Sequence, residues 1–260
     1  MEKYPQTNIH PKAKIGKNVI IEPFSTIQED VEIGDGTWIG SNVTIFNGAR
    51  IGKNCKIFPG TVISAIPQDL KFDNEYTTVE VGDNTVLREY VTIHRGTTDK
   101  LVTKIGSNCL LMAYVHVGHD CIIGNKCILA NCVQIGGHVV LEDYVIIEAV
   151  AGVQQFIKIG THAFLASGTN ARKNVPPYVK AARDPLTFAG VNSVGLRRRG
   201  FTSETIIQIE DIYRNIYTRG LNVSNAVKVI EQEAPKSDEK EIILKFIEES
   251  TKGIIRGPLN

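Results

Sequence analysis

A six-residue hydrophobic period governs most of this 260-residue chain. Stepping by six from Ile9 gives isoleucine at every position through Ile63, and the same phase resumes after interruptions and reaches Leu165. Of the 27 positions in this series, 24 are Ile, Leu or Val. The three exceptions are Asp69, Glu75 and Asp99. An α-helix repeats every ~3.6 residues, whereas short strands joined by tight turns can follow a six-residue period, so the pattern is typical of a parallel β-helix.

A small or β-branched residue lies four positions after almost every aliphatic one, with Ile157 as the large exception. Four of the five cysteines take this small position: Cys55, Cys109, Cys121 and Cys127. We interpret them as core residues, because cysteine packs as a small hydrophobe. Cys132 lies off this position, and the chain has no CxxC pair that indicates a disulfide framework or a zinc knuckle.

Two stretches interrupt the repeat, at about 64–80 and about 98–104, and we expect each to form a projecting loop. The coils then run to about Ala171. Pro176 and Pro177 predict their end, because proline cannot donate to a strand ladder. The domain prediction is a β-helix over residues 1–185 and a small helical domain over 186–260.

The C-terminal stretch predicts four helices bounded by capping residues, glycines or prolines. Their expected ranges are 189–200, 202–219, 224–234 and 237–252. We expect these helices to cover the last coil, which would otherwise expose unpaired strand edges.

Composition excludes several classes of function. The formal net charge of +1 gives no electrostatic reason to expect a nucleic-acid partner. No apolar run reaches ~18 residues, so we do not expect an integral membrane protein. The N-terminal residues lack the apolar core of a secretory signal, and we expect a cytoplasmic protein.

The repeat resembles the left-handed parallel β-helix of the hexapeptide-repeat acyltransferases. This resemblance implies the left hand, because crossovers between parallel strands are otherwise right-handed. It also implies three hexapeptides in each triangular coil of 18 residues. A residue then lies about 4.8 Å beneath the one 18 positions later. His119 therefore lies beneath Gly137, and Asp120 beneath His138.

These stacked residues favour acyl transfer. A neutral histidine is suited to accept the proton of a hydroxyl nucleophile, and a glycine N–H can stabilise the oxyanion that forms. Two other interpretations remain open. The residues can be polar turn residues without a task, or His116, His119 and His138 can supply three imidazoles to zinc. Asp120 beside His119 favours an oriented base.

Several motifs, in order, make the resemblance closer. The chain carries PQDLK, TIHRG, HVGHDC, ILANC, GGHV, NVPPY, GVN and LRRRGF. Together they resemble the bacterial UDP-N-acetylglucosamine O-acyltransferases. The resemblance implies transfer of a long 3-hydroxyacyl chain from acyl carrier protein to the sugar 3-hydroxyl, the first step of lipid A biosynthesis. It implies a homotrimer with sites between subunits, and no metal or other cofactor.

The same resemblance assigns roles by motif. His119 is implied as the general base, Asp120 as the residue that orients it, and the Gly137 N–H as the oxyanion donor. The implied substrate-binding residues are Asp69, Lys71, His116, His138, Gln154, Gln155, Ser167, Asn192 and Arg198.

The chain departs from the family pattern at two positions. Gln154 stands where the family commonly has histidine, and Val194 where it commonly has an acidic residue. Ser167 falls where relatives vary the side chain that limits acyl length, and its small size suggests a long chain.

Three rival functions stay open. One is the related N-acyltransferase, which normally has an extra N-terminal domain, whereas here the repeats begin at Ile9. The second is an acetyltransferase that uses coenzyme A. The third is a β-helical scaffold or zinc protein without acyl transfer.

Overall fold

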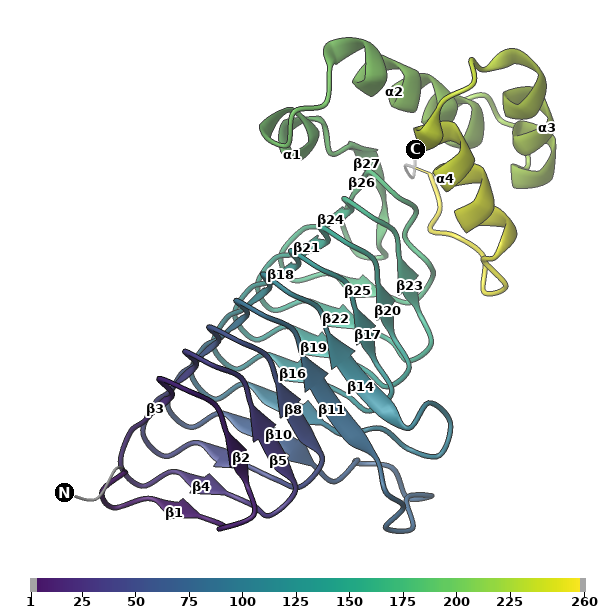
Figure 1. Cartoon of the computed structure of the whole chain (residues 1–260). Coiled ribbons are helices and arrows are strands. Elements are labelled where there is room, and N and C mark those ends of the chain that lie inside the picture. The colour runs from purple at the N-terminus through teal and green to yellow at the C-terminus, as the bar shows by residue number, and fades with distance from the viewer. Residues whose placement is uncertain (1–3, 258–260) are drawn as a thin grey trace.

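A computed structural model describes residues 4–257, which form a triangular prism of stacked coils with four helices at one end (Figure 1). Each turn of the chain adds one short strand to each of three sheets. Most strands are two residues long, because a six-residue repeat leaves little room beyond its turn. Strand β1 lies at the end of the prism away from the helices.

Three sheets form the faces of the prism within residues 4–257. The first contains β1 (Asn8–Ile9), β4 (Thr26–Ile27), β7 (Thr44–Ile45), β10 (Val62–Ala65), β13 (Thr92–His94), β16 (His116–Val117), β19 (Gln134–Ile135), β22 (Gly152–Val153) and β25 (Asn170–Ala171). The second contains β2 (Lys14–Ile15), β5 (Val31–Ile33), β8 (Ala49–Ile51), β11 (Thr78–Val81), β14 (Val102–Ile105), β17 (Ile122–Ile123), β20 (Val140–Leu141) and β23 (Lys158–Ile159). The third contains β3 (Ile20–Ile21), β6 (Trp38–Ile39), β9 (Lys56–Ile57), β12 (Val86–Leu87), β15 (Leu110–Leu111), β18 (Ile128–Leu129), β21 (Ile146–Ile147), β24 (Phe164–Leu165), β26 (Val179–Ala182) and β27 (Thr187–Val191).

Strand register confirms the 18-residue coil. His116 pairs with Gln134, and Gln134 pairs with Gly152, so equivalent residues of adjacent coils lie side by side. The aliphatic series points inward and is buried from Ile21 to Leu165. The four cysteines in the small position are also buried, as predicted, whereas Cys132 is exposed.

The first projecting loop is shorter than the sequence predicted, and the second is shifted. The first spans 66–77, because β10 and β11 extend into the predicted 64–80. The second spans 95–101 and not 98–104, because β13 ends at His94 and β14 begins at Val102. Strands β11 and β14 pair over four residues, from Thr78–Val102 to Val81–Ile105, which is a longer ladder than a hexapeptide usually makes. The loops leave the same edge of the prism (Figure 1), and the Thr98 N–H donates to Glu75 at 3.1 Å.

The coils continue one strand beyond their predicted end. Pro176 and Pro177 lie between β25 and β26, where no strand ladder requires their missing N–H groups, and β26 then pairs in parallel with β24. Strand β27 pairs antiparallel with β26. Residues 189–191 are therefore strand and not the start of a helix, because their pairing with β26 is a long-range effect that local sequence does not show.

The helices are α1 (Ser193–Arg198), α2 (Ser203–Tyr217), α3 (Val223–Glu233) and α4 (Asp238–Glu248). Thr202 and Ser237 cap α2 and α4 as predicted, each accepting a backbone N–H of the first turn. Helix α4 ends four residues earlier than the predicted 252. Helix α2 packs against β27, at the end of the third sheet. The domain boundary at 185/186 stays a prediction.

No helix within residues 4–257 has the length and apolar character needed to cross a membrane.

Candidate active site

A groove of about 520 Å³ runs along the prism edge between the first and second sheets. One column of residues lines it, formed by the same position in five successive coils. From the N-terminal side, this column is His94, Gly118, Gly136, Gln154 and Arg172. Because the second and third members lack side chains, the groove is open at its centre.

The groove brings together five residues that the sequence analysis singled out. They are His116, His119, Gly137, Gln154 and Gln155. It also contains five that the sequence analysis missed: Gln68, His94, Gln134, Asn170 and Arg172. Coil spacing could have found three of these, because Gln134 and Asn170 lie one and three coils after His116, and Arg172 lies one coil after Gln154.

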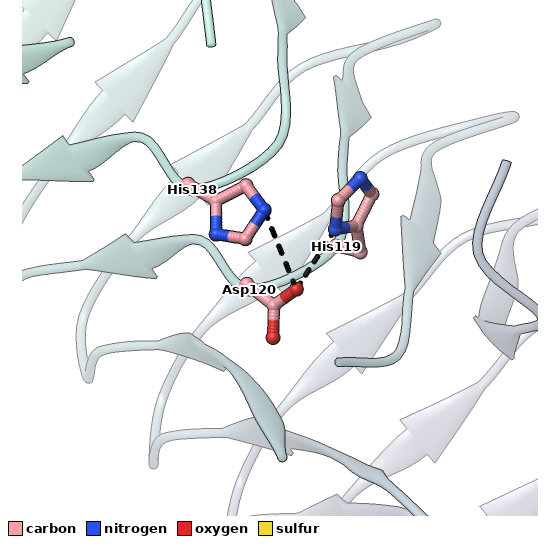
Figure 2. A group of neighbouring side chains, drawn as sticks. All are labelled: His119, Asp120 and His138. Carbon is pink, nitrogen blue, oxygen red and sulfur yellow. Dashed lines mark hydrogen bonds and ion pairs between the residues drawn. The ribbon is translucent and has the colours of Figure 1, made fainter. Parts of the chain in front are cut away.

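His119 and Asp120 form a hydrogen-bonded pair beside this groove (Figure 2). His119 Nδ1 lies 2.8 Å from Asp120 Oδ2, and Asp120 is completely buried. The carboxylate therefore accepts the Nδ1–H and leaves the His119 Nε2 as the basic nitrogen. Within residues 4–257, this Nε2 has no hydrogen-bond partner, so it is free to accept a proton.

The second loop holds Asp120 in its charged form. The Asp120 carboxylate accepts the Thr97 N–H at 2.9 Å, the Thr97 hydroxyl at 2.6 Å and the Lys100 N–H at 3.2 Å. Burial acts to raise the pKa of Asp120, but the hydrogen bonds from Thr97 and His119 outweigh it and lower this pKa below its ordinary value. Asp120 thus remains an anion that orients His119.

Gly137 lies against the His119 ring. A Cβ at position 137 would stand 2.6 Å from His119 Nε2, so only glycine leaves the ring in place. The Gly137 N–H has no acceptor in the described part of the chain. A Cβ on Gly118 would lie 2.8 Å from the Gly137 nitrogen, so glycine at position 118 keeps that amide uncovered. The base and the free amide thus face one space.

His138 lies behind this pair and does not line the groove. Its ring meets the His119 ring edge-on, with centroids 4.9 Å apart, and stacks on Phe156 at 4.3 Å. The predicted position of Asp120 beneath His138 is confirmed, and Phe156 follows in the next coil. The His138 Nδ1 lies 3.1 Å from an oxygen of Asp99, a residue of the second loop.

His116 faces the groove from the first sheet. Its Nδ1 lies 2.8 Å from the Thr92 hydroxyl. Burial lowers the pKa of His116, and the nearby His119 acts in the same direction. His116 is therefore suited to hydrogen bonding as a neutral ring.

His119, Asp120 and His138 could in principle bind a metal, because each offers one atom and these atoms lie within 4.8 Å of one another. However, the lone pairs of Asp120 already accept hydrogen bonds from Thr97, Lys100 and His119. A metal would have to displace them, so these contacts favour orientation of a base over metal binding.

The other sequence-predicted residues do not line the groove of a single chain. Asp69 and Lys71 lie in the first loop, whose Gln68 does reach the groove. Ser167 is exposed, and its N–H donates to Glu148.

Asn192 caps α1 by accepting the Gly195 N–H, and its amide donates to the His162 carbonyl at 3.0 Å. Arg198 is exposed on the same helix. Both therefore lie at the junction of the coils with the helices.

Comparison with known families identifies both parts of the chain. The family model described as "Bacterial transferase hexapeptide (six repeats)" matches residues 12–47, 30–65 and 103–137. The model described as "Udp N-acetylglucosamine O-acyltransferase; Domain 2" matches residues 174–255.

A relative from Janthinobacterium sp. (strain Marseille) is named an acyl-(acyl-carrier-protein)–UDP-N-acetylglucosamine O-acyltransferase. It is 40% identical over 258 residues, which cover 97% of this chain and 98% of the relative. This chain belongs to the UDP-N-acetylglucosamine O-acyltransferase family. It is therefore an acyltransferase, as the sequence predicted.

Two solved structures of UDP-N-acetylglucosamine acyltransferases are similar to this chain over almost its whole length. The enzyme from Bacteroides fragilis 9343 has a TM-score of 0.96 and 48% identity, with coverage of 97% of this chain and 99% of the other. The enzyme from Francisella novicida has a TM-score of 0.95 and 39% identity, with coverage of 98% and 94%. The predicted fold, a left-handed parallel β-helix with a small C-terminal helical part, is confirmed.

Proposed function

We propose that this chain transfers a long 3-hydroxyacyl group from acyl carrier protein to the 3-hydroxyl of UDP-N-acetylglucosamine, as the first step of lipid A biosynthesis. Family membership supports the reaction class. The observation that carries the mechanism is the arrangement of Asp120, His119 and Gly137, which gives an oriented base and a free amide at one point of the groove.

The reaction begins when the His119 Nε2 takes the proton of the sugar 3-hydroxyl. The hydroxyl oxygen bonds to the thioester carbon, and the carbonyl oxygen becomes an oxyanion that accepts the Gly137 N–H. Asp120 stabilises the imidazolium that forms. As the intermediate collapses, the carbon–sulfur bond breaks, and His119 returns its proton to the departing thiolate.

The remaining predicted residues bind substrate in this proposal. His116, Gln154 and Gln155 contact the sugar and acyl groups from the groove, and His138 supports the site from behind. Asp69 and Lys71 contact the sugar and its phosphates from the first loop. Ser167 borders the acyl chain.

Asn192 and Arg198 bind the UDP end of a neighbouring subunit's site. This assignment requires the homotrimer, because within one chain these two residues do not line the groove. The proposal also keeps the expectation that the enzyme works in the cytoplasm and needs no metal or redox cofactor.

An acyl-transfer assay tests this function. UDP-N-acetylglucosamine is offered with a panel of 3-hydroxyacyl carrier proteins of different chain lengths, and the product is identified by mass. We expect an O-acylated sugar nucleotide, with the highest rate for a long chain. No product with any donor would contradict the proposal.

The same assay separates the rivals. Acylation of UDP-glucosamine in preference to the acetylated sugar would indicate an N-acyltransferase. A preference for acetyl coenzyme A over every carrier-bound donor would indicate an acetyltransferase. Activity that disappears with a chelator and returns with zinc would favour the metal interpretation.

A further inference from the structure

His94 is a buried histidine in the groove to which the proposed mechanism gives no role. It is 7% exposed, and it lines the groove at the N-terminal end of its column. Its Nδ1 is buried and has no hydrogen-bond partner among residues 4–257. An atom that is closed to solvent is also closed to a ligand, so a substrate in the groove can meet only the other ring nitrogen of His94, the Nε2, which is not closed off and forms no hydrogen bond within residues 4–257.

A strand irregularity lies beside His94. Strand β10 changes register between Ile63 and Ala65, so His94 pairs with Ala65. Ser64, the residue passed over, has a φ of 65°, a left-handed conformation that is unfavourable for serine. Bulges of this kind redirect side chains and are common next to active sites. Here the bulge also precedes the first loop, which brings Gln68 to the same groove.

The surroundings of His94 keep it neutral. Its ring meets the His116 ring edge-on, with centroids 4.8 Å apart. Burial lowers the pKa of His94 to about 4, and His116 and His119 act in the same direction. A neutral imidazole can donate one hydrogen bond and accept another, which suits a hydroxyl or acetamido group. A phosphate would instead require a cation.

The position of His94 indicates which substrate it meets. It lies one coil on the N-terminal side of Gly118, which adjoins the free Gly137 amide. The other end of the column carries Gln154 and the cationic Arg172. The groove lining beside His94 is neutral, with His116 and Gln68. It is next to the first loop, whose Asp69 and Lys71 the proposal places on the sugar and its phosphates.

We propose that His94 is a substrate-positioning residue that hydrogen-bonds the uncharged sugar ring of the acceptor and sets its 3-hydroxyl against His119. This inference rests on the proposed function, and it adds a contact that the sequence did not assign. The substrate group then supplies a hydrogen-bond partner to the His94 Nε2.

The test compares His94→Phe with His94→Gln. Phenylalanine keeps an aromatic ring against His116 but forms no hydrogen bond, whereas glutamine can restore one. We expect His94→Phe to raise the KM for the sugar nucleotide roughly 3- to 10-fold, the range for one lost hydrogen bond, and to leave the KM for the acyl donor unchanged. His94→Gln should recover part of the affinity.

Thr92→Val is the matched control, because it removes the hydroxyl that contacts His116 from the same strand. If His94 only supported His116, which the proposal places on both the sugar and the acyl group, His94→Phe and Thr92→Val would change the kinetics in the same way, through both KM values or through kcat. That result, or equal increases in both KM values of His94→Phe, would overturn the proposal. Thermal unfolding of each variant shows whether the protein is folded.

Wild-type turnover separates the two proposals. If wild type does not acylate the sugar nucleotide, the proposed function fails before His94 is tested. If wild type is active and His94→Phe keeps a normal acceptor KM, the His94 assignment alone fails.

Discussion

The coils of residues 9–63 and those of residues 105–165 share one architecture but differ at one edge. In the early coils, Glu29 occupies the position that His119 takes in the later ones. Glu29 is exposed and pairs with Lys12 at 2.5 Å, an ion pair at the surface. His119 and Asp120 are buried and hydrogen-bonded to each other. The same backbone position therefore holds either a solvated charge or an oriented base.

The two loops account for this difference. The second loop places Thr97 and Lys100 over the Asp120 carboxylate, and the first loop holds the second through Glu75 and Thr98. The early coils have no such insertion. The repeat thus supplies regular positions, and the insertions make one of those positions chemically distinct.

Gly137→Ala should give the largest effect among the variants that keep both His119 and Asp120. The new Cβ would stand 2.6 Å from His119 Nε2 and displace the ring. We expect kcat to fall on the order of 10²–10³-fold, as when an oxyanion site is disturbed. Steady-state kinetics measure this, with thermal unfolding as the control. A variant with normal kcat would show that the close contact is not needed.

Asp120→Asn should lower kcat roughly 100-fold, within the range for impaired general-base catalysis. An amide cannot accept all the hydrogen bonds that the carboxylate takes from Thr97, Lys100 and His119. The variant should also unfold at a lower temperature, since buried donors lose their acceptor. Unchanged activity in a less stable protein would limit Asp120 to a structural role.

Lowering the pH should decrease the free energy of unfolding through His94, a buried histidine at the groove edge. Because the pKa of His94 in the folded protein is about 4, against ~6.5 for an unperturbed histidine, the unfolded chain binds a proton first as pH falls. Stability is therefore lost between about pH 6.5 and 4, and the loss at pH 5, relative to neutral pH, amounts to roughly 2 kcal/mol. Urea unfolding at pH 7.5 and 5 should show a smaller loss for His94→Gln than for wild type. Equal losses would contradict the assignment of this effect to His94.

Glu29→Ala should give the smallest effect. Its ion pair with Lys12 is exposed, and such pairs contribute little. We expect less than a twofold change in the rate of acyl transfer. A large loss would mean that the early coils take part in the chemistry.

Much of this molecule could be predicted from its sequence, because every hexapeptide contributes to the core in the same way. One aliphatic and one small residue in each hexapeptide determine the core, and the 18-residue spacing placed His119, Gly137 and His138 together. The helix caps at Thr202 and Ser237 were also predictable, because each contacts a residue only three positions later in the sequence.

Long-range contacts escaped prediction. Thr97, which donates to Asp120, lies in the second loop, where the 18-residue spacing does not hold. The spacing therefore could not predict this contact. His94 precedes Gly118, its neighbour in the groove column, by 24 residues and not 18, because the second loop adds six residues to that coil. Residues 189–191 formed a strand because β26 offered a free edge. In each case the deciding partner lies outside the local pattern.

The most direct test of the central claim is the kcat of His119→Ala, measured beside Glu29→Ala with UDP-N-acetylglucosamine and the best 3-hydroxyacyl carrier protein. If the edge of the later coils carries the base, His119→Ala loses roughly 10²–10⁴-fold in kcat and unfolds near the wild-type temperature, while Glu29→Ala keeps wild-type turnover. Near-normal turnover by His119→Ala would contradict the account.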